Sequence, residues 1–444
     1  MSLQLIFTDK KFRPLYWIQF LGALNDNLLK NGMVILVEYK GLSVLGLDPP
    51  SIVALAGAVF ILPFFMFSML SGQIADRFDK ARVVRAIKLW ELLITLTCTI
   101  GFLGHNLYVL LAALFMMGCH STFFGPIKYS ALPDLVEPEM LVTANAYVEA
   151  GTFIAILIGT IGGGFLISMA AGEYWISMVI NACALTGVVM SWRMPSLPSH
   201  SPDLKLRWKP FGLMVENFGL LKRKAAVFHS VIGISWFWAF GAVILSVLPP
   251  YCKEFLHADE HVVTCFLAMF TVGIAIGSIL CERLSRGRLE LGLVPVGSIG
   301  LTLFLFDLSL VRPVAPDASD PLMTLAQFVA KPFGPRLLFD FTLMSVFGGF
   351  YILPLYTALQ ARSAKRSRSQ VIAGNNVMNS IFMVGGAIGV MACHSFGLGI
   401  PNTLLILAFC NVVAAAFIFS MAPEFRLRFY ALVRRRARRM RQFS

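Results

Sequence analysis

The chain has 444 residues, of which 57% are hydrophobic and only 14% are charged, and its mean hydropathy is +0.75. This composition excludes an ordinary water-soluble domain, because such domains carry about 25% charged residues. The apolar residues form continuous runs of about 20, long enough to cross a bilayer as helices, which excludes a β-barrel with its alternating strands. We therefore predict an all-α polytopic membrane protein.

Twelve apolar runs predict twelve transmembrane helices. We do not expect the first run to be a cleaved signal peptide, because it extends over about 25 residues and contains an Asp. The runs cover residues 14–38, 51–75, 83–103, 107–132, 142–169, 173–194, 227–252, 261–281, 291–311, 336–359, 371–396 and 402–421.

The formal net charge of +13 follows membrane topology rather than a nucleic-acid surface. If the N-terminus is cytoplasmic, thirty of the 37 Lys and Arg residues fall in inner segments and only five in outer loops. Lys and Arg concentrate on the cytoplasmic side of membrane proteins. We therefore predict that both termini are cytoplasmic and that nucleic acid is not a partner.

The first span places charged residues near the middle of the hydrocarbon core of the bilayer. In "QFLGALNDNLLKNGMVILV", Asp26 lies near the membrane midplane, Lys30 follows one helical turn later, and Asn27 and Asn31 flank them. A charged residue at this depth costs about 2.5–3.5 kcal/mol on insertion scales. One interpretation is a self-satisfied ion pair that only fixes helix packing. We favour a second one, in which both charges face a wet cavity and bind a zwitterionic or anionic headgroup.

Spans four and five carry further candidate substrate-binding residues. Lys128 and Tyr129 follow Pro126, which predicts a kink near the end of the fourth span. Asn145 and Glu149 are one turn apart on the same face of the fifth span.

Other polar residues in the first half have simpler interpretations. Lys88 and Glu91 are three residues apart in the third span and predict a local ion pair at the membrane interface. His120 is expected to be a packed polar residue rather than a proton carrier. The glycines of "GTIGGG" (159–164) predict close helix packing or flexibility.

The seventh span is aromatic where the first span is charged. Trp236, Phe237 and Trp238 stand at the positions of the second half that correspond to Asp26 and its polar neighbours in the first half. Charge on one wall of a cavity and aromatic rings on the other suit an amphiphile better than a sugar or an ion. Trp236 and Trp238 are therefore further candidates for substrate binding.

Two stretches of the first half recur in similar form in the second half, and each such pair is called an echo below. "GQIADRFDKAR" (72–82) is echoed by "SILCERLSRGR" (278–288), and "ANAYVEA" (144–150) by "GNNVMNS" (374–380). Parallel repeats of this kind are typical of alternating-access transporters. We predict a first six-helix bundle over 1–194, a cytoplasmic linker over 195–226, a second bundle over 227–421 and a basic tail over 422–444.

The first echo resembles a known signature. Gly72, Asp76, Arg77 and Lys80 fit G-x-x-x-D-R-x-x-K, which is similar to the loop signature of the major facilitator superfamily. The resemblance implies two pseudo-symmetric six-helix bundles and a cytoplasmic latch, with Asp76 capping the N-terminus of span 11. The alternative is that these charges only set topology. The expected gating residues are Asp76, Arg77, Lys80, Glu282 and Arg283.

Three longer stretches narrow the resemblance. "QFLGALNDNLLKNG" (19–32), "GPIKYSALPDLV" (125–136) and "ANAYVEAGTFIAILIGTIGGG" (144–164) are similar to the bacterial lysophospholipid transporter family. The resemblance implies a flippase that moves lysophospholipids, such as lysophosphatidylethanolamine, from the outer to the inner leaflet of the bacterial cytoplasmic membrane. It also implies re-acylation by a separate acyltransferase/acyl-carrier-protein synthetase.

Two other functions are alternatives to lysophospholipid transport. A proton-coupled exporter of amphiphilic drugs would use Asp26 or Glu149 as the proton carrier. A membrane acyltransferase would need a His beside an Asp or Glu at a membrane face, in a pattern such as H-x-x-x-x-D, and His229, His257 and His394 have no such partner. Without a G-x-x-x-x-G-K-[ST] loop we expect no nucleotide hydrolysis. We predict a monomeric transporter that is no enzyme and needs no cofactor or metal.

The basic tail has three possible roles. "RRRARRMRQ" (434–442) is expected to bind the anionic inner leaflet. It could also be an ordinary stop signal after the last span, or a docking site for the acyltransferase.

Overall fold

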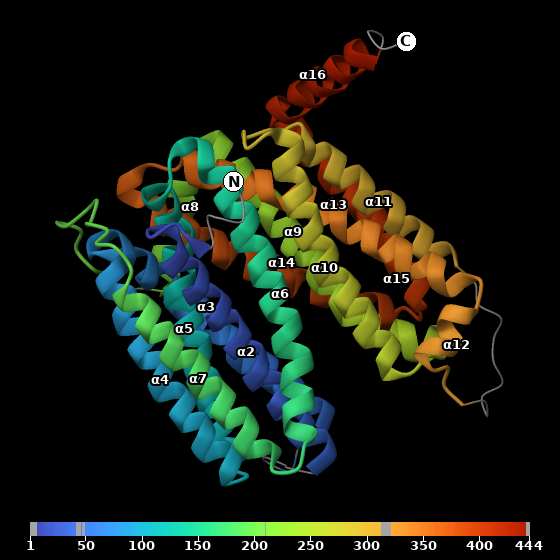
Figure 1. Cartoon of the computed structure of the whole chain (residues 1–444). Coiled ribbons are helices and arrows are strands. Elements are labelled where there is room, and N and C mark those ends of the chain that lie inside the picture. Colours follow the sequence, from blue (N-terminus) through green and yellow to red (C-terminus); the bar gives the residue numbers. More distant parts are fainter. Residues whose placement is uncertain (1–6, 41–45, 47–48, 209, 312–320, 441–444) are drawn as a thin grey trace. The chain divides into compact units, whose positions relative to one another are not determined.

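The computed structural model describes residues 7–40, 46, 49–208, 210–311 and 321–440 (Figure 1). Over these residues the chain is helical, and the only strand-like pairing is an isolated bridge between Ala258 and Met323. The prediction of an all-α protein is therefore confirmed.

All twelve predicted spans coincide with long α-helices, and three further α-helices of the described residues lie outside them. The spans are α2 (Phe12–Lys40), α3 (Pro49–Arg77), α4 (Lys80–Leu103), α5 (Leu107–Leu135), α6 (Leu141–Ser168), α7 (Gly172–Trp192), α9 (Ala225–Pro250), α10 (Glu260–Ser285), α11 (Leu293–Leu310), α13 (Phe333–Arg362), α14 (Arg368–Ser395) and α15 (Ile400–Met421). The others are α8 (Pro210–Lys222), α12 (Leu325–Ala330) and α16 (Pro423–Met440).

Eleven helices of the described chain are long and apolar enough to cross a membrane. The twelfth, α2, has 29 residues but is not among them. It is the helix that carries Asp26, Lys30 and three asparagines, so the polar residues that single it out in sequence also lower its hydropathy.

Contacts within the described structure group the chain into two units. The first contains α2 to α5, α7, α8, residues Gln360–Ser380 and α6 apart from Asn145–Ala150. The second contains α9 to α13 as far as Leu359, and then α15, α16 and α14 from Ile381 onward. These units follow contacts rather than the sequence echo, so the predicted domain boundaries stay a prediction.

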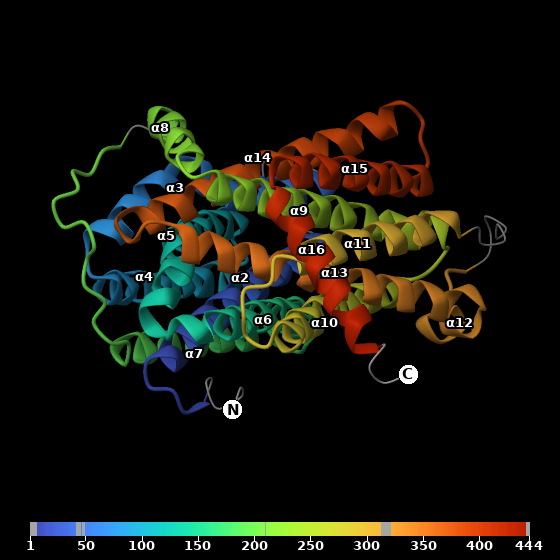
Figure 2. The same cartoon turned by 90° about the horizontal axis from the view of Figure 1, so that it is seen from above.

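In the first unit, α2, α4, α5 and α7 pack around one hydrophobic core. α4 lies along α5 and α7, α3 lies along α5, and α2 lies along α7 (Figures 1 and 2). The core includes Met33, Phe102 and Ile180, none more than 1% exposed. α4 and α5 begin at side-chain caps, where Asp79 and Asn106 accept backbone N–H groups.

Glycines allow close approach of α6 to α2. A methyl group at Gly159 would lie 2.7 Å from the carbonyl oxygen of Leu24, and one at Gly163 would lie 2.8 Å from that of Leu28. No larger residue fits at either position without moving a backbone. The prediction of close packing by the "GTIGGG" stretch is therefore confirmed.

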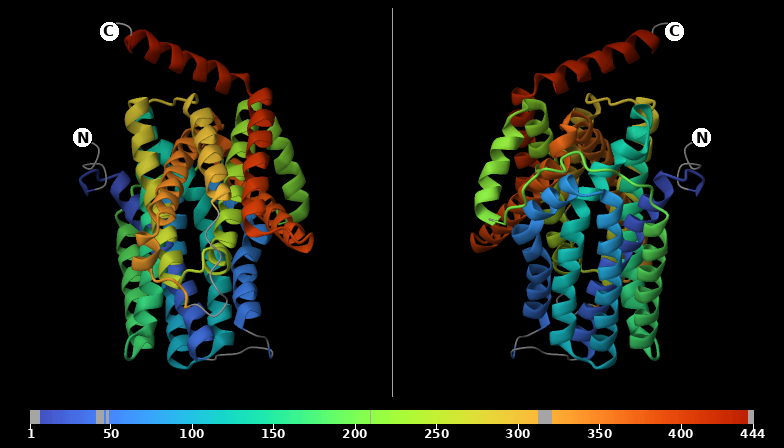
Figure 3. Two further views of the ribbon diagram at one scale, coloured as in Figure 1. Left: turned by 90° about the vertical axis from the view of Figure 1, so that its right-hand side faces the viewer. Right: turned by 90° about the vertical axis from the view of Figure 1, so that its left-hand side faces the viewer.

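In the second unit, α13 packs closely against α10 and α11. A methyl group at Gly277 of α10 or Gly297 of α11 would collide with the backbone of α13 at Val346 or Tyr351. α15 packs along α11, and α16 contacts the ends of both helices. Figure 3 shows α16, in red, leaving α15 at an angle rather than extending it.

Candidate substrate site and gate

Asp26 is only partly satisfied by its neighbours in the first unit. The hydroxyl of Ser121 on α5 donates to Asp26 Oδ2 at 2.7 Å. Among the described residues nothing donates to Oδ1 of Asp26, although this atom is buried. A buried carboxylate oxygen that receives no hydrogen bond is costly inside a membrane protein. It therefore marks a position where a cationic group of a ligand would bind favourably.

Lys30 makes no direct ion pair with Asp26 among the described residues. Its side chain is exposed, and within the described chain it has neither an ion pair nor a hydrogen bond. The amide of Asn31 donates to Asn27 O at 2.9 Å and to Thr160 Oγ1 at 3.4 Å, and that of Asn27 donates to Ala23 O at 2.8 Å. Both asparagines are therefore held by local bonds, and the two charges remain available one turn apart.

A second charged cluster lies fully inside the first unit. Lys88 and Glu91 of α4 form an ion pair, and both side chains are 0% exposed. Asn25 donates to Glu91 Oε1 at 3.1 Å, and Nε2 of His120 lies 3.5 Å from Glu91 Oε2. The predicted pair therefore forms, and neighbouring helices cover both charges. Its place at the membrane interface stays a prediction.

A glycine makes room for this cluster. A methyl group at Gly187 of α7 would lie only 2.7 Å from the Lys88 side chain. His120 is 1% exposed and stacks on Phe124 with ring centroids 6.3 Å apart. It is thus packed, as its sequence context suggested.

The candidates on α5 and α6 are engaged in polar contacts. Lys128 Nζ donates to Thr152 Oγ1 at 2.8 Å and lies 4.8 Å from the ring centroid of Tyr129. Asn145 and Glu149, on the segment of α6 assigned to the second unit, are 0% and 2% exposed. Buried polar groups of this kind need partners, and both residues have them.

The two tryptophans of α9 point to different neighbours. Trp236 Nε1 donates to Asn411 Oδ1 on α15 at 2.7 Å, whereas Trp238 Nε1 donates to Tyr356 Oη on α13 at 2.9 Å. Asn411 in turn donates to Thr302 on α11 at 2.8 Å. Only Trp236 lines the apolar cavity described next.

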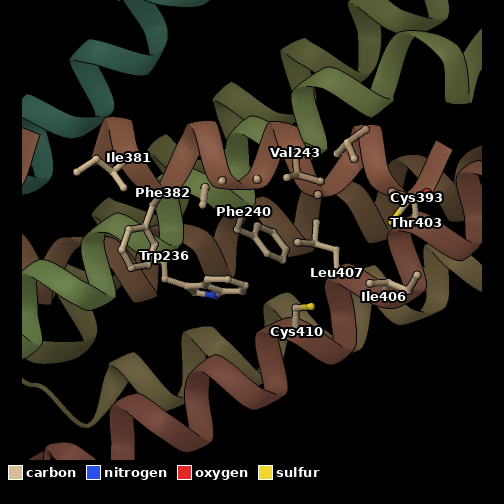
Figure 4. A pocket seen from close by; sticks show the side chains of 15 residues that line it. Trp236, Phe240, Val243, Ile381, Phe382, Cys393, Thr403, Ile406, Leu407 and Cys410 are labelled. Atoms are coloured by element: carbon tan, nitrogen blue, oxygen red, sulfur yellow. The ribbon is translucent and has the colours of Figure 1, made fainter. Parts of the chain in front are cut away.

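An apolar cavity of about 440 Å³ lies between α9, α14 and α15 of the second unit (Figure 4). Trp236 and Phe240 form part of its wall, together with Leu407. A methyl group at Gly385 or Gly389 of α14 would meet no atom within 4 Å. These glycines therefore widen the cavity instead of bringing helices together.

Asp76 caps the start of α14. Its carboxylate accepts the backbone N–H groups of Ser369 and Gln370 at 3.0 and 3.1 Å, and the Gln370 side-chain amide at 3.1 Å. Ser369 Oγ also donates to Ser130 Oγ on α5 at 2.9 Å. All four residues belong to the first unit, and an anion at a helix N-terminus is favoured by the helix dipole.

Asp134 joins three basic residues beside this cap. Lys80 Nζ, His200 Nε2 and Arg368 Nη1 lie 3.4, 3.2 and 3.3 Å from its carboxylate. Lys80 is only 2% exposed, so this ion pair is largely removed from solvent. Asp134 therefore connects the end of α5, the start of α4, the linker and the start of α14.

The other predicted gating residues lie differently. Arg77 stacks over Phe78 at 5.3 Å. Glu282 and Arg283 are in the last turn of α10 in the second unit, half-buried and exposed respectively. Asp76 thus contacts α14 directly, and Lys80 is linked to it through Asp134. Among the described contacts, Arg77 is not joined to α14.

Sequence reasoning missed Asp134, Arg368 and Asn411. Asp134 is part of the quoted "GPIKYSALPDLV" stretch, and a buried Asn in the last span was a signal comparable to Asp26 in the first. The partners of Asp134 lie 54, 66 and 234 residues away along the chain, so no local spacing reveals them.

Known proteins resemble this chain along most of its length. A sequence model described as Major Facilitator Superfamily matches residues 15–381. The lysophospholipid transporter LplT of Serratia proteamaculans is 28% identical over 370 residues, which cover 81% of each chain. The protein of the same name from Escherichia coli O6:H1 is 27% identical, with 83% of this chain and 84% of that protein covered.

Solved structures resemble the fold. A variant of the E. coli fucose:proton symporter FucP has a TM-score of 0.69 at 16% identity and covers 93% of this chain and 98% of that one. The proton:xylose symporter XylE has a TM-score of 0.67 at 13% identity, covering 95% and 96%. At such identities the likeness concerns the fold. The family model matches most of the length of this chain, which also has the twelve helices and the Asp76 signature. This chain therefore belongs to the major facilitator superfamily.

Proposed function

We propose that this protein transports lysophospholipids, such as lysophosphatidylethanolamine, across the bacterial cytoplasmic membrane. The observation that carries the proposal is the similarity to lysophospholipid transporters, which extends over about four fifths of both chains. The relatives do not favour the alternative, an exporter of amphiphilic drugs. The major facilitator superfamily is a class of membrane transporters and not a class of enzymes.

The chemistry of α2 supports a zwitterionic headgroup. Asp26 has a buried oxygen without a donor, and Lys30, one turn away, offers an ammonium that makes no ion pair or hydrogen bond within the described structure. A headgroup with an ammonium and a phosphate supplies the complementary charges. Lys128 and Tyr129 of the first unit are further candidates for the same headgroup, with Asn27 and Asn31 positioning α2. Asn145 and Glu149 stay candidates for substrate binding.

The apolar cavity of the second unit supports an amphiphilic substrate. Its volume of about 440 Å³ falls in the range of small-molecule sites, and Trp236 forms part of its wall. We propose that a single acyl chain occupies it, while Trp238 supports α13 through Tyr356 rather than contacting this chain.

The transport cycle we propose is alternating access with a cytoplasmic latch. Asp76, Lys80 and Asp134 hold the start of α14 when the cytoplasmic side is closed, and Glu282 and Arg283 are the corresponding charges of the second half. Lysophospholipid would enter from the outer leaflet and leave to the inner one. There a separate acyltransferase/acyl-carrier-protein synthetase would re-acylate it, with both termini of the transporter cytoplasmic.

Uptake of labelled lysophosphatidylethanolamine by spheroplasts tests this function. We expect uptake that depends on the protein, and no protein-dependent efflux of a lipophilic cation. Cation efflux without lysolipid uptake would instead favour the drug exporter.

A further inference from the structure

A second, polar cavity lies in the first unit, beneath the segment that links the two halves of the sequence. Its volume is about 340 Å³, and α3, α8, the extended residues before α8 and the start of α14 form its walls. Lys205, Arg207 and Arg223 line it together with Glu216. None of the candidate substrate residues on α2, α5, α6 or α9 lies in this cavity.

Hydrogen bonds hold the walls of this cavity in place. Gln73 of α3 accepts the backbone N–H of Arg207 at 2.9 Å and donates to its carbonyl at 3.2 Å. Asn217 of α8 donates to the carbonyl of Gln370 at 2.9 Å. The linker, α3 and α14 are therefore tied together around a preformed space.

The charge around the cavity is unbalanced. Arg207 is paired with Glu216, with one Nη1 to Oε1 distance of 3.3 Å. Lys205 and Arg223 are exposed, and within the described residues their side chains have neither an ion pair nor a hydrogen bond. Two uncompensated cations at one cavity favour an anion, and a phosphate accepts hydrogen bonds from both Lys and Arg.

The surface beside the cavity indicates where that phosphate comes from. Leu206, Trp208 and Val215 are 37%, 62% and 71% exposed, so apolar side chains alternate with the basic ones. The Trp208 ring stacks on Phe67 of the membrane-spanning α3 with centroids 6.2 Å apart. Trp is enriched at the level of lipid headgroups, where basic pockets bind anionic lipids.

We infer that this cavity binds the phosphate of an anionic phospholipid in the leaflet that faces the linker. Lys205 and Arg223 donate to the phosphate, while the acyl chains extend along Trp208 and Val215 into the bilayer. The lipid bound here is a resident ligand, separate from the substrate bound near Asp26. The inference does not depend on which substrate the protein transports.

A lipid-binding titration of the purified full chain tests the inference. The probes are phosphatidylglycerol, phosphatidylcholine and inorganic phosphate, and complexes are counted by native mass spectrometry. The variant is Lys205→Gln with Arg223→Gln. The matched control is Arg193→Gln with Lys365→Gln, which removes the same charge from two exposed residues outside the cavity.

We expect the wild-type protein to prefer phosphatidylglycerol over phosphatidylcholine, and the cavity variant to bind phosphatidylglycerol about tenfold more weakly. The control variant should keep at least half of the wild-type affinity, and Lys205→Gln alone should fall between. Equal affinity of cavity variant and control would overturn the site. Displacement of phosphatidylglycerol by millimolar inorganic phosphate would overturn the lipid assignment and leave a soluble-phosphate site.

Discussion

Two carboxylates inside the first unit have opposite surroundings. Each keeps one buried oxygen that receives no hydrogen bond from the described residues, but Glu91 forms an ion pair with Lys88 and accepts a hydrogen bond from Asn25, whereas Asp26 receives only the hydrogen bond from Ser121. A buried carboxylate with an ion-pair partner stabilises a packing arrangement, while one without such a partner is available to a ligand. We therefore assign Glu91 to the fold and Asp26 to the substrate.

Replacing Asp26 tests this assignment. Asp26→Asn keeps the shape of the side chain and removes its charge. We expect lysolipid transport to fall roughly tenfold or more, because the loss of one hydrogen bond to a charged group costs about 1.5–3 kcal/mol. Ser121→Ala is the control, because it removes the neighbour and leaves the carboxylate. Labelled-lysolipid uptake at equal expression is the measurement, and uptake unchanged in Asp26→Asn contradicts the headgroup role.

Replacing Lys88 tests the structural role of the buried pair. Lys88→Met leaves Glu91 buried without its cation, which should destabilise the protein by about 3–5 kcal/mol. Lys88→Met with Glu91→Leu removes both charges and should recover much of that loss. Thermal unfolding in detergent measures both variants. If the double variant is no more stable than the single one, Lys88 does not stabilise the protein through its ion pair with Glu91.

At the scale of helices, the start of α14 and the start of α4 meet at one place. Asp76 caps α14, Asp79 caps α4, and Asp134 holds Lys80 and Arg368, the first residue of each helix. Three carboxylates thus fix two helix N-termini, which the helix dipole favours. Such a contact can open as a unit, because each bond loses its geometry when one helix moves.

Removing the Asp76 cap should open this contact. Ser130 and Ser369 are 0% exposed behind it, so a cysteine at Ser130→Cys should react slowly with a polar reagent while Asp76 is present. Adding Asp76→Ala should raise its labelling rate several-fold from the cytoplasmic side. Adding Asp79→Ala instead, which leaves α14 untouched, should not. Equal labelling with and without Asp76 contradicts the latch.

The cap of α4 should make stability depend on pH. Partial burial raises the pKa of Asp79, but hydrogen bonds from Ser196 and from backbone N–H groups including that of Arg82 outweigh it, so the pKa lies below the usual 3.8. The carboxylate therefore stabilises the fold above pH 3.8, and this contribution is lost as pH falls through the lower folded-state value.

Asp79→Asn tests this dependence. The variant should lose about 1 kcal/mol or less at pH 7, because Asn is also a good cap, and should show a smaller loss of thermal stability between pH 5 and pH 3 than wild type. An identical pH profile in both proteins would rule out Asp79 as a source of the acid sensitivity.

At the scale of the whole molecule, the sequence predicted the elements better than their contacts. Span length and hydropathy are local properties, so all twelve spans were predictable. The spacing of Lys88 and Glu91 predicted a pair but not its burial, which depends on residues of other helices such as Gly187. Asp76 was predictable because a signature contains it, while its neighbour Asp134 acquires its role from residues far along the chain.

The most direct test of the account is transport by the purified protein in proteoliposomes. Fluorescent lysophosphatidylethanolamine is placed in the outer leaflet, and its loss of accessibility to an external quencher is followed for wild type, Asp26→Asn and Ser121→Ala. We predict faster inward movement with wild type and Ser121→Ala than in protein-free vesicles, and a rate near that of protein-free vesicles with Asp26→Asn. Wild-type vesicles no faster than protein-free ones would contradict the proposal that this protein moves lysophospholipids.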